Sequence, residues 1–491
     1  MKILKVACRV LTRSNVSKPY TFLLVKKYFR QDGRTYGHAA VNLYLPVGTP
    51  VIPKLTPDAV NEVLQKNEVK VKLNPGISVV NSYCSNQLAS NSPIEDQRAE
   101  AQCCLTDGVL VGVFDGHSGP KCAQVVSERL FDYIAAEILP YDTLLSVYKK
   151  IEAKETSLVR WLGGKAIPMS PNAELHHHSL VKYLYENVSV DSEADDYIPD
   201  MMATAFDRLD QDLTTEALSH SDDISVSDEC LRTVFSGACA NVAFFQGNDL
   251  YVANSGDCRA VLGVQMDNGV WSPIVLSNDH NAYNNNEVNR VKSSHPANES
   301  MTVIRQERLL GELMPLRAFG DARFKWQGEI QKDIFRKWEK QHGPQLRNFH
   351  LPRNFYTPPY LVPTPEVTHY NLEGKTGFLI LATDGLWEML DPDKAVALVG
   401  AHSEAMGQMG PYSPAAKVTL GEIRTALAQR RFSLRPLDTN VSTHLIRYAL
   451  CGVGHTFDYD KLAESVSLPP NIVRHYRDDI TVTVVFFNGK Q

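Results

Sequence analysis

The sequence predicts an α+β protein in which strands and helices alternate irregularly. Three apolar runs, at 109–114, 378–382 and 480–487, have the length and composition of strands that are covered on both faces. Between residues 240 and 276, short apolar runs are separated by Gly-Asn-Asp, Ser-Gly-Asp and Asp-Asn-Gly turns, which indicates an antiparallel meander. Helical spacing of apolar residues elsewhere completes the mixed pattern of this class.

Three segments have the features of helices. A short helix is predicted over 56–67, where a proline stands at the first helical position. Residues 121–139 place apolar side chains on one face, so this helix should cover the sheet. In the acidic region 140–230, apolar residues over 202–213 are spaced by four, three and four, which predicts one core-facing helix. The three histidines at 176–178 of that region are expected in a solvated loop.

Composition excludes several classes of protein. A net charge of -6 is not the footprint of a nucleic-acid-binding protein. No apolar stretch approaches the roughly 18 residues that a membrane-spanning helix needs. The nine cysteines include no Cys-x-x-Cys pair, which argues against a disulfide framework and against a structural zinc site. Reduced thiols of this kind suit the mitochondrial matrix.

The first thirty residues differ from the rest, because they carry eight Lys and Arg residues and no acidic residue. On a helix, Lys2, Lys5, Arg9 and Arg13 share one face and leave apolar residues on the other, as in a mitochondrial transit peptide. The alternative is a basic solvated tail that binds an anionic partner.

The predicted organisation has three parts. Residues 1–30 are the transit peptide, whose cleavage site the sequence does not locate, and 31–75 form an N-terminal arm. One large catalytic domain, 76–490, follows, because the motifs of a single site are spread over roughly 400 residues. Insertions are expected in it near 140–200 and 325–365.

Carboxylates stand where the three buried strands meet solvent. Asp115 ends the first run before a Gly-rich turn, Asp384 follows the second, and Asp478 and Asp479 precede the third. Each aspartate alone would be read as a turn residue. Three strand ends with matching flanks instead indicate a site for a hard cation, Mg²⁺ or Mn²⁺, because no His or Cys cluster accompanies them.

These motifs resemble the signatures of the metal-dependent type 2C Ser/Thr phosphatases. Val-Phe-Asp-Gly-His-Ser-Gly at 113–119 and Ala-Thr-Asp-Gly-Leu-Trp at 382–387 carry the resemblance. Further matching segments follow in the family's order at 236–238, 253–259, 279–280, 317–321 and 477–479. The resemblance implies a four-layer sandwich, in which two antiparallel β-sheets are flanked by α-helices.

The resemblance also implies a metal centre with two Mg²⁺ or Mn²⁺ ions. Asp115 matches the carboxylate that bridges them, Gly116 offers its backbone carbonyl, and Asp384 and Asp478 match terminal ligands. Asp257 matches a ligand of a weaker third ion. A hydroxide that bridges the metals would attack the phosphorus of the substrate.

Other residues are assigned supporting roles by the same resemblance. Glu95, Asp96 and Asp479 would accept hydrogen bonds from metal-bound waters. Glu388 stands where the family has an aspartate near the third ion, and the extra methylene puts the affinity of that site in doubt.

His117 matches the general acid that protonates the leaving serine oxygen, although a histidine at a turn can also serve packing alone. Asn91 stands where many members have a phosphate-binding arginine. Either the metals suffice there, or Arg98 or Arg317 takes over the contact with phosphate.

Within the family, the segments 86–88, 318–321, 324–326 and 356–361 resemble the branch that reactivates mitochondrial pyruvate dehydrogenase by removing phosphate from serines of its alpha subunit. The implied partners are phosphorylated pyruvate dehydrogenase and the lipoyl domain of the dihydrolipoyl acetyltransferase core. The aromatic and basic residues of 325–365 would form the docking surface, or else a packed insertion.

The sequence leaves several points open: a regulatory subunit, calcium dependence of docking, and the preference between Mg²⁺ and Mn²⁺. Another mitochondrial phosphoprotein is the alternative substrate. A pseudophosphatase scaffold is the alternative from another class, but such a protein should have lost Asp115, Asp384 or Asp478, and all three are present.

Overall fold

The structure is a computed structural model, and it describes residues 21–31, 34–45, 54–74, 78–163, 172–189, 197–219, 224–342, 350–409, 418–431, 436–451 and 458–488. The chain divides into two compact units, Met1–Lys54 and Leu55–Gln491. In the first unit, β1 (Thr21–Gln31) pairs with β2 (Arg34–Leu45) as an antiparallel hairpin. The basic helix predicted from Lys2 to Arg13 lies outside the described residues.

Two antiparallel sheets form the centre of the second unit. The six-stranded sheet has the order β11-β10-β16-β17-β4-β3. Its strands are β3 (Val69–Lys72), β4 (Val80–Leu88), β10 (Arg259–Gln265), β11 (Trp271–Val275), β16 (Thr376–Ala382) and β17 (Ile480–Asn488). The seven-stranded sheet has the order β15-β9-β8-β6-β5-β7, with β14 paired to β8. Its strands are β5 (Gln97–Cys103), β6 (Val109–His117), β7 (Val159–Trp161), β8 (Gly237–Gln246), β9 (Asp249–Ser255), β14 (Phe319–Gly320) and β15 (Glu366–Asn371).

The three apolar runs, in β6, β16 and β17, are continuous because these strands are buried on both faces. In β6, Val111 and Val113 join the core between the sheets, whereas Leu110 and Phe114 face a core built with helices. In β16 the alternation is the same, with Leu379 and Leu381 in the core between the sheets and Ile380 in the core on the other side. The sheets therefore pack face to face, and each has a helical layer outside it.

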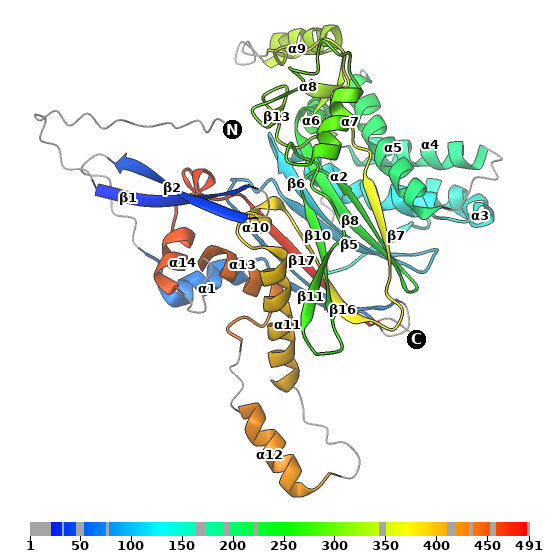
Figure 1. Cartoon of the computed structure of the whole chain (residues 1–491). Helices are drawn as coiled ribbons and strands as arrows, with labels where there is room; N and C mark the ends of the chain where they lie inside the picture. The colour runs from blue at the N-terminus through cyan, green and yellow to red at the C-terminus, as the bar shows by residue number, and fades with distance from the viewer. Residues whose placement is uncertain are drawn as a thin grey trace, which may run out of the picture. The chain divides into compact units, whose positions relative to one another are not determined.

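In the described part of the chain, helices from one continuous stretch of sequence cover the seven-stranded sheet (Figure 1). They are α2 (Lys121–Glu137), α3 (Tyr141–Glu152), α4 (Ala173–Ser189), α5 (Ile198–Leu218) and α6 (Ile224–Phe235). The predicted core faces are confirmed, since Phe131 of α2 and Met202 and Phe206 of α5 are fully buried. The helix predicted over 202–213 is confirmed as part of α5, and α3, α4 and α6 also form in the region 140–230. The three histidines lie in α4 rather than in a loop.

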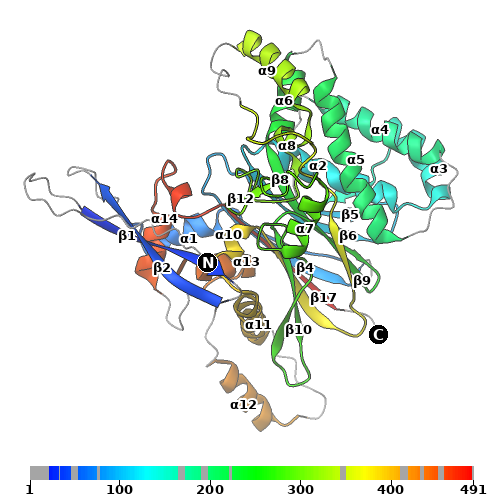
Figure 2. The ribbon, with the colours of Figure 1, turned by 45° about the horizontal axis from the view of Figure 1, so that its top comes forward.

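The layer beside the six-stranded sheet is formed from segments distant in sequence (Figure 2). Its helices are α1 (Pro57–Gln65), α10 (Asp384–Trp387), α11 (Pro392–Met409), α13 (Val441–Cys451) and α14 (Tyr459–Val466). Helix α12 (Leu420–Arg431) follows α11 in the chain. The short helix predicted at 56–67 is confirmed as α1, whose first residue is Pro57. These layers confirm the predicted sandwich. No helix in the described part of the chain is long and apolar enough to cross a membrane.

A smaller subdomain follows the meander and adjoins the site. It contains α7 (Asn285–Ser293), the hairpin of β12 (Ile304–Arg305) and β13 (Arg308–Leu309), α8 (Ala322–Lys325) and α9 (Gly328–His342). Its own apolar cluster includes Leu309, Leu316 and Tyr360.

Most aromatic residues of 325–365 pack inward. Trp326 and Tyr360 are 6% and 2% exposed. Phe335 and Trp338 of α9 contact Phe235 of α6, with ring centroids 4.7 and 6.3 Å away. For these side chains the structure favours the packed insertion over the interface anchors.

Candidate active site

The fold brings the strand-end carboxylates to one place. β16 and β17 are antiparallel neighbours with Ala382 opposite Val482, so Asp384 and Asp478 project from the same edge of the six-stranded sheet. Asp115 reaches this edge from β6 of the other sheet. Burial raises the pKa of Asp115 well above its ordinary value, and repulsion from Asp384, Asp96 and Asp257 raises it further.

Asp384 has a matching environment. Burial raises its pKa well above the ordinary value, and Asp257, Asp478 and Glu388 add to the effect. Its Oδ1 atom is buried and has no hydrogen-bond partner among the described residues. A buried carboxylate oxygen without a donor, surrounded by like charges, is an arrangement that a divalent cation would stabilise.

The carboxylates of the site fit Mg²⁺ or Mn²⁺ as ions that keep part of their water shell. Across the described ranges, no three His, Cys, Asp or Glu side chains converge closely enough to hold one ion between them. Mg²⁺ commonly takes one or two carboxylates and keeps several waters, so a complete protein cage is not required. The carboxylates therefore fit hydrated hard cations better than a tightly caged metal.

Gly116 lets the backbone approach closely at this point. A Cβ atom there would lie 2.2 Å from the carbonyl oxygen of Glu95. The Glu95 carboxylate in turn accepts a hydrogen bond from the backbone N–H of Gly119 at 2.7 Å. The turn after Asp115 is thus held against the segment that precedes β5.

Asp479 and Asp96 organise the surrounding loops. Asp479 accepts hydrogen bonds from the backbone N–H groups of Asn91 and Glu95, both at 2.8 Å. Asp96 accepts one from the hydroxyl of Thr383 at 2.8 Å, next to Asp384. Burial raises the pKa of Asp96 well above its ordinary value, followed by repulsion from Asp479.

Asp257 lies at the turn after β9, where Gly256 has a φ of 113°. Its Oδ1 accepts a hydrogen bond from the Cys239 thiol at 3.2 Å, and burial raises its pKa. Both Asp257 and Glu388 contribute to the electrostatic field at Asp384. The residues predicted for a third ion therefore lie within electrostatic reach of the main carboxylates.

His117 has a carboxylate partner that the sequence did not single out. Its Nε2 lies 2.6 Å from Oδ2 of Asp321. Burial lowers the pKa of His117, but Asp321, with smaller contributions from Asp257 and Glu95, raises it, and the pKa is raised overall. Asp321 adopts the left-handed region with a φ of 50°, which is uncommon for a residue other than glycine. The Arg-Ala-Phe-Gly-Asp segment was the available signal for it.

The three phosphate-binding candidates are engaged by carboxylates. The side-chain amide of Asn91 donates to Oδ2 of Asp479 at 3.0 Å. Nη1 of Arg98 donates to both carboxylate oxygens of Glu100, at 2.8 and 2.7 Å.

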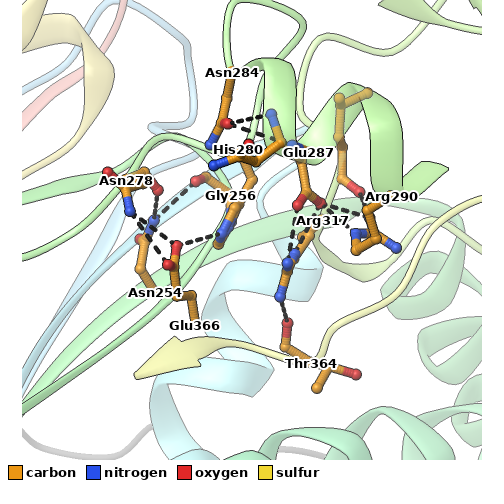
Figure 3. A network of polar contacts seen from close by, with 12 residues as sticks. Asn254, Gly256, Asn278, His280, Asn284, Glu287, Arg290, Arg317, Thr364 and Glu366 are labelled. Atoms are coloured by element: carbon orange, nitrogen blue, oxygen red, sulfur yellow. Dashed lines mark hydrogen bonds and ion pairs between the residues drawn. The ribbon is translucent and has the colours of Figure 1, made fainter. Parts of the chain in front are cut away.

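Arg317 belongs to the polar network in Figure 3. Its Nε and Nη2 donate to Glu287 at 2.8 and 2.9 Å, and its Nη1 donates to the carbonyl oxygen of Thr364 at 2.9 Å. Arg290 also donates to Glu287. The network thus joins α7 to the segments that lead into β14 and β15, which is a structural use of Arg317.

The chain belongs to the protein phosphatase 2C family. The family model for protein phosphatase 2C matches residues 178–430, more than half of the chain. Enzymes of this family are protein phosphatases that depend on Mg²⁺ or Mn²⁺.

Individual relatives match over most of the chain. The chain is 42% identical over 457 residues to the mitochondrial pyruvate dehydrogenase (acetyl-transferring)-phosphatase 1 of Bos taurus, covering 90% of this chain and 84% of that one. It is 40% identical over 447 residues to phosphatase 2 of Homo sapiens, covering 89% and 84%. Among solved structures, a serine-threonine phosphatase 2C from Toxoplasma gondii is 16% identical with a TM-score of 0.41, covering 86% of this chain and 99% of that chain.

Proposed function

We propose that this protein phosphatase removes phosphate from serines of the pyruvate dehydrogenase alpha subunit in the mitochondrial matrix. Similarity along 90% of the chain to a protein named for that substrate supports the choice. The main structural support is that Asp115, Asp384 and Asp478 lie at one edge of the sandwich and interact electrostatically. Metal-dependent hydrolysis would depend on these carboxylates.

We infer that Asp115, the carbonyl of Gly116, Asp384 and Asp478 hold two Mg²⁺ or Mn²⁺ ions. Asp257, with Glu388 nearby, would serve a weaker third site. When bound, the cations supply charge neutralisation for the phosphoryl group and an activated water.

The protein's own groups complete the reaction. His117 donates a proton to the serine oxygen as the bond to phosphorus breaks, and Asp321 orients the imidazole ring. Asp479 and Asp96 keep the loops around the carboxylates in place through the hydrogen bonds described above.

Recruitment would come from outside the metal site, because metal dependence is general to the family and does not by itself select a substrate. The lipoyl domain of the acetyltransferase core is the proposed docking partner. On α9, Arg336 and Lys337 are 65% and 59% exposed. Tyr356 is 68% exposed. With the other aromatics packed inward, a docking surface in 325–365 would use these exposed groups. Residues 1–30 are proposed as the import sequence.

The test is phosphate release from phosphorylated pyruvate dehydrogenase with Mg²⁺, Mn²⁺ or a chelator, with an unrelated phosphoserine peptide as comparison. We expect metal-dependent release that is faster on the intact complex than on the peptide, and slowed by free lipoyl domain. Release that persists in chelator would contradict the metal mechanism. Hydrolysis of the peptide with no action on the complex would contradict the substrate.

A further inference from the structure

A substrate phosphate needs a positively charged partner, and Asn91 brings no charge and donates its side-chain amide to Asp479. The two arginines considered from the sequence are held elsewhere, Arg98 by Glu100 and Arg317 by Glu287. Arg477, directly before Asp478, is 8% exposed and donates to the hydroxyl of Ser90 and the carbonyl of Ala89. These contacts point its guanidinium into the protein.

Arg474 differs from all of these. It lies in the 3₁₀ turn Val473–His475, one helical turn before Asp478. Its Nη1 forms an ion pair with Oδ2 of Asp478, and its side chain is 48% exposed. Its positive charge also interacts with the carboxylates of Asp384 and Asp479. An exposed guanidinium therefore stands at the edge of the carboxylate cluster.

The donor geometry leaves capacity for a ligand. A guanidinium has five N–H donors in a planar fork, and the contact with Asp478 uses one side of it. Within the described residues, the structure gives the guanidinium no other hydrogen bond. Asp478 thus orients the fork, while the remaining donors can meet an anion that sits over the carboxylates.

We propose that Arg474 is the phosphate-binding residue of this enzyme and supplies the charge that Asn91 does not. It binds the oxygens of the substrate phosphate bidentately, while Asp478 holds the guanidinium from the opposite side. The ligand class is a phosphate monoester dianion, and the inference rests on the proposed function.

The first test measures phosphate binding without turnover. Inorganic phosphate is titrated calorimetrically into the Mn²⁺-loaded full chain of wild type, Arg474→Gln and Arg474→Lys. We expect Arg474→Gln to weaken phosphate binding by about 10-fold or more, since a charged hydrogen-bonding partner is lost. The phosphate affinity of Arg474→Lys should lie between those of wild type and Arg474→Gln, because lysine keeps the positive charge but lacks the planar set of guanidinium donors. The control Arg232→Gln makes the same change at an exposed residue of α6 and should bind phosphate as wild type does.

The second test is rescue. Asn91→Arg in the Arg474→Gln background should recover phosphate affinity and the Michaelis constant for a phosphoserine peptide. The proposal would be overturned if Arg474→Gln bound phosphate as wild type does and bound Mn²⁺ more tightly. Arg474 would then serve only to balance the negative charge of the carboxylates. The two proposals fail separately. Wild type that binds phosphate through Arg474 but hydrolyses no phosphoprotein would contradict the function and not this contact.

Discussion

At the scale of single residues, the chemistry depends on carboxylates that repel one another. Asp115 and Asp384 are partly buried, and repulsion from neighbouring carboxylates helps to raise the pKa of each. In the absence of cations, repulsion within such a cluster destabilises the folded protein. The same negative charges stabilise cations that bind there. Function and stability are therefore opposed at these positions.

The first prediction concerns Asp384→Asn. The change removes a negative charge but little volume, so we expect at least about 100-fold lower metal-dependent activity, as for loss of a group that acts on the transition state. The metal-free variant should melt at the same temperature as wild type or higher, because repulsion is relieved. Thermal melts with and without Mn²⁺ measure this, and the rise in melting temperature caused by Mn²⁺ should shrink. Wild-type activity in this variant would refute the assignment.

The second prediction separates the acid role of His117 from packing. His117→Ala should lose much more activity on a phosphoserine peptide than on para-nitrophenyl phosphate, whose leaving group needs no proton. Asp321→Asn should show the same selective loss, smaller in size, because its carboxylate orients the ring at 2.6 Å. Equal losses on both substrates would indicate a structural role for the histidine.

At the scale of elements, helices α2 and α5 are joined by a buried ion pair. Nη1 and Nη2 of Arg129 donate to the two oxygens of Glu216 at 2.8 and 2.7 Å. Arg129 also donates to the hydroxyl of Tyr133, which donates to Asp212. The pair lies among apolar side chains that cover the seven-stranded sheet, so its partners depend on each other.

The third prediction follows from that dependence. Arg129→Met should lower the free energy of unfolding by about 3 to 5 kcal/mol, because Glu216 is left buried without its partner. The double variant Arg129→Met with Glu216→Leu should recover much of the loss. Urea unfolding of the wild type, both single variants and the double variant gives the coupling free energy between Arg129 and Glu216. Additive losses would show that the two side chains act independently.

At the scale of the whole molecule, stability depends on histidines that fold in the neutral form. Burial lowers the pKa of His444 to about 4, and the neighbouring His402 lowers it further. Burial likewise lowers the pKa of His176 to about 4. A histidine with a lowered folded pKa contributes stability above its unfolded pKa, near 6.5, and that contribution is lost as the pH falls toward the folded pKa.

The fourth prediction is a pH dependence that belongs to His444. Between pH 7 and pH 5 this residue should remove about 2 kcal/mol of stability, since the unfolded chain takes up a proton that the folded one excludes. His444→Gln should reduce the fall in stability over this range by about that amount. The measurement is urea unfolding at both pH values, and the same slope in both proteins would disprove the attribution.

The sequence by itself determined the fold class, the helix faces of α2 and α5, and the family. These properties follow from local patterns, namely alternation in the strands, helical spacing, and aspartates next to glycine at strand ends. Each pattern reports burial or backbone preference over a few residues, and burial on both faces of β6 and β16 explains why their apolar runs are unbroken.

The tertiary structure alone decided which side chains meet. His117 and Asp321 are 204 positions apart, so no local pattern could pair them. Arg317 forms an ion pair with Glu287, and Trp338 packs on Phe235. Arginine and tryptophan are residue types that often bind ligands, but here both are engaged within the protein. The extra helices of 140–230 form because packing against α5 and the sheet outweighs weak local signals. Which side chains pair depends on how distant strands align and on which charged groups compete for the same partner. The spacing of residues along the chain does not contain this information.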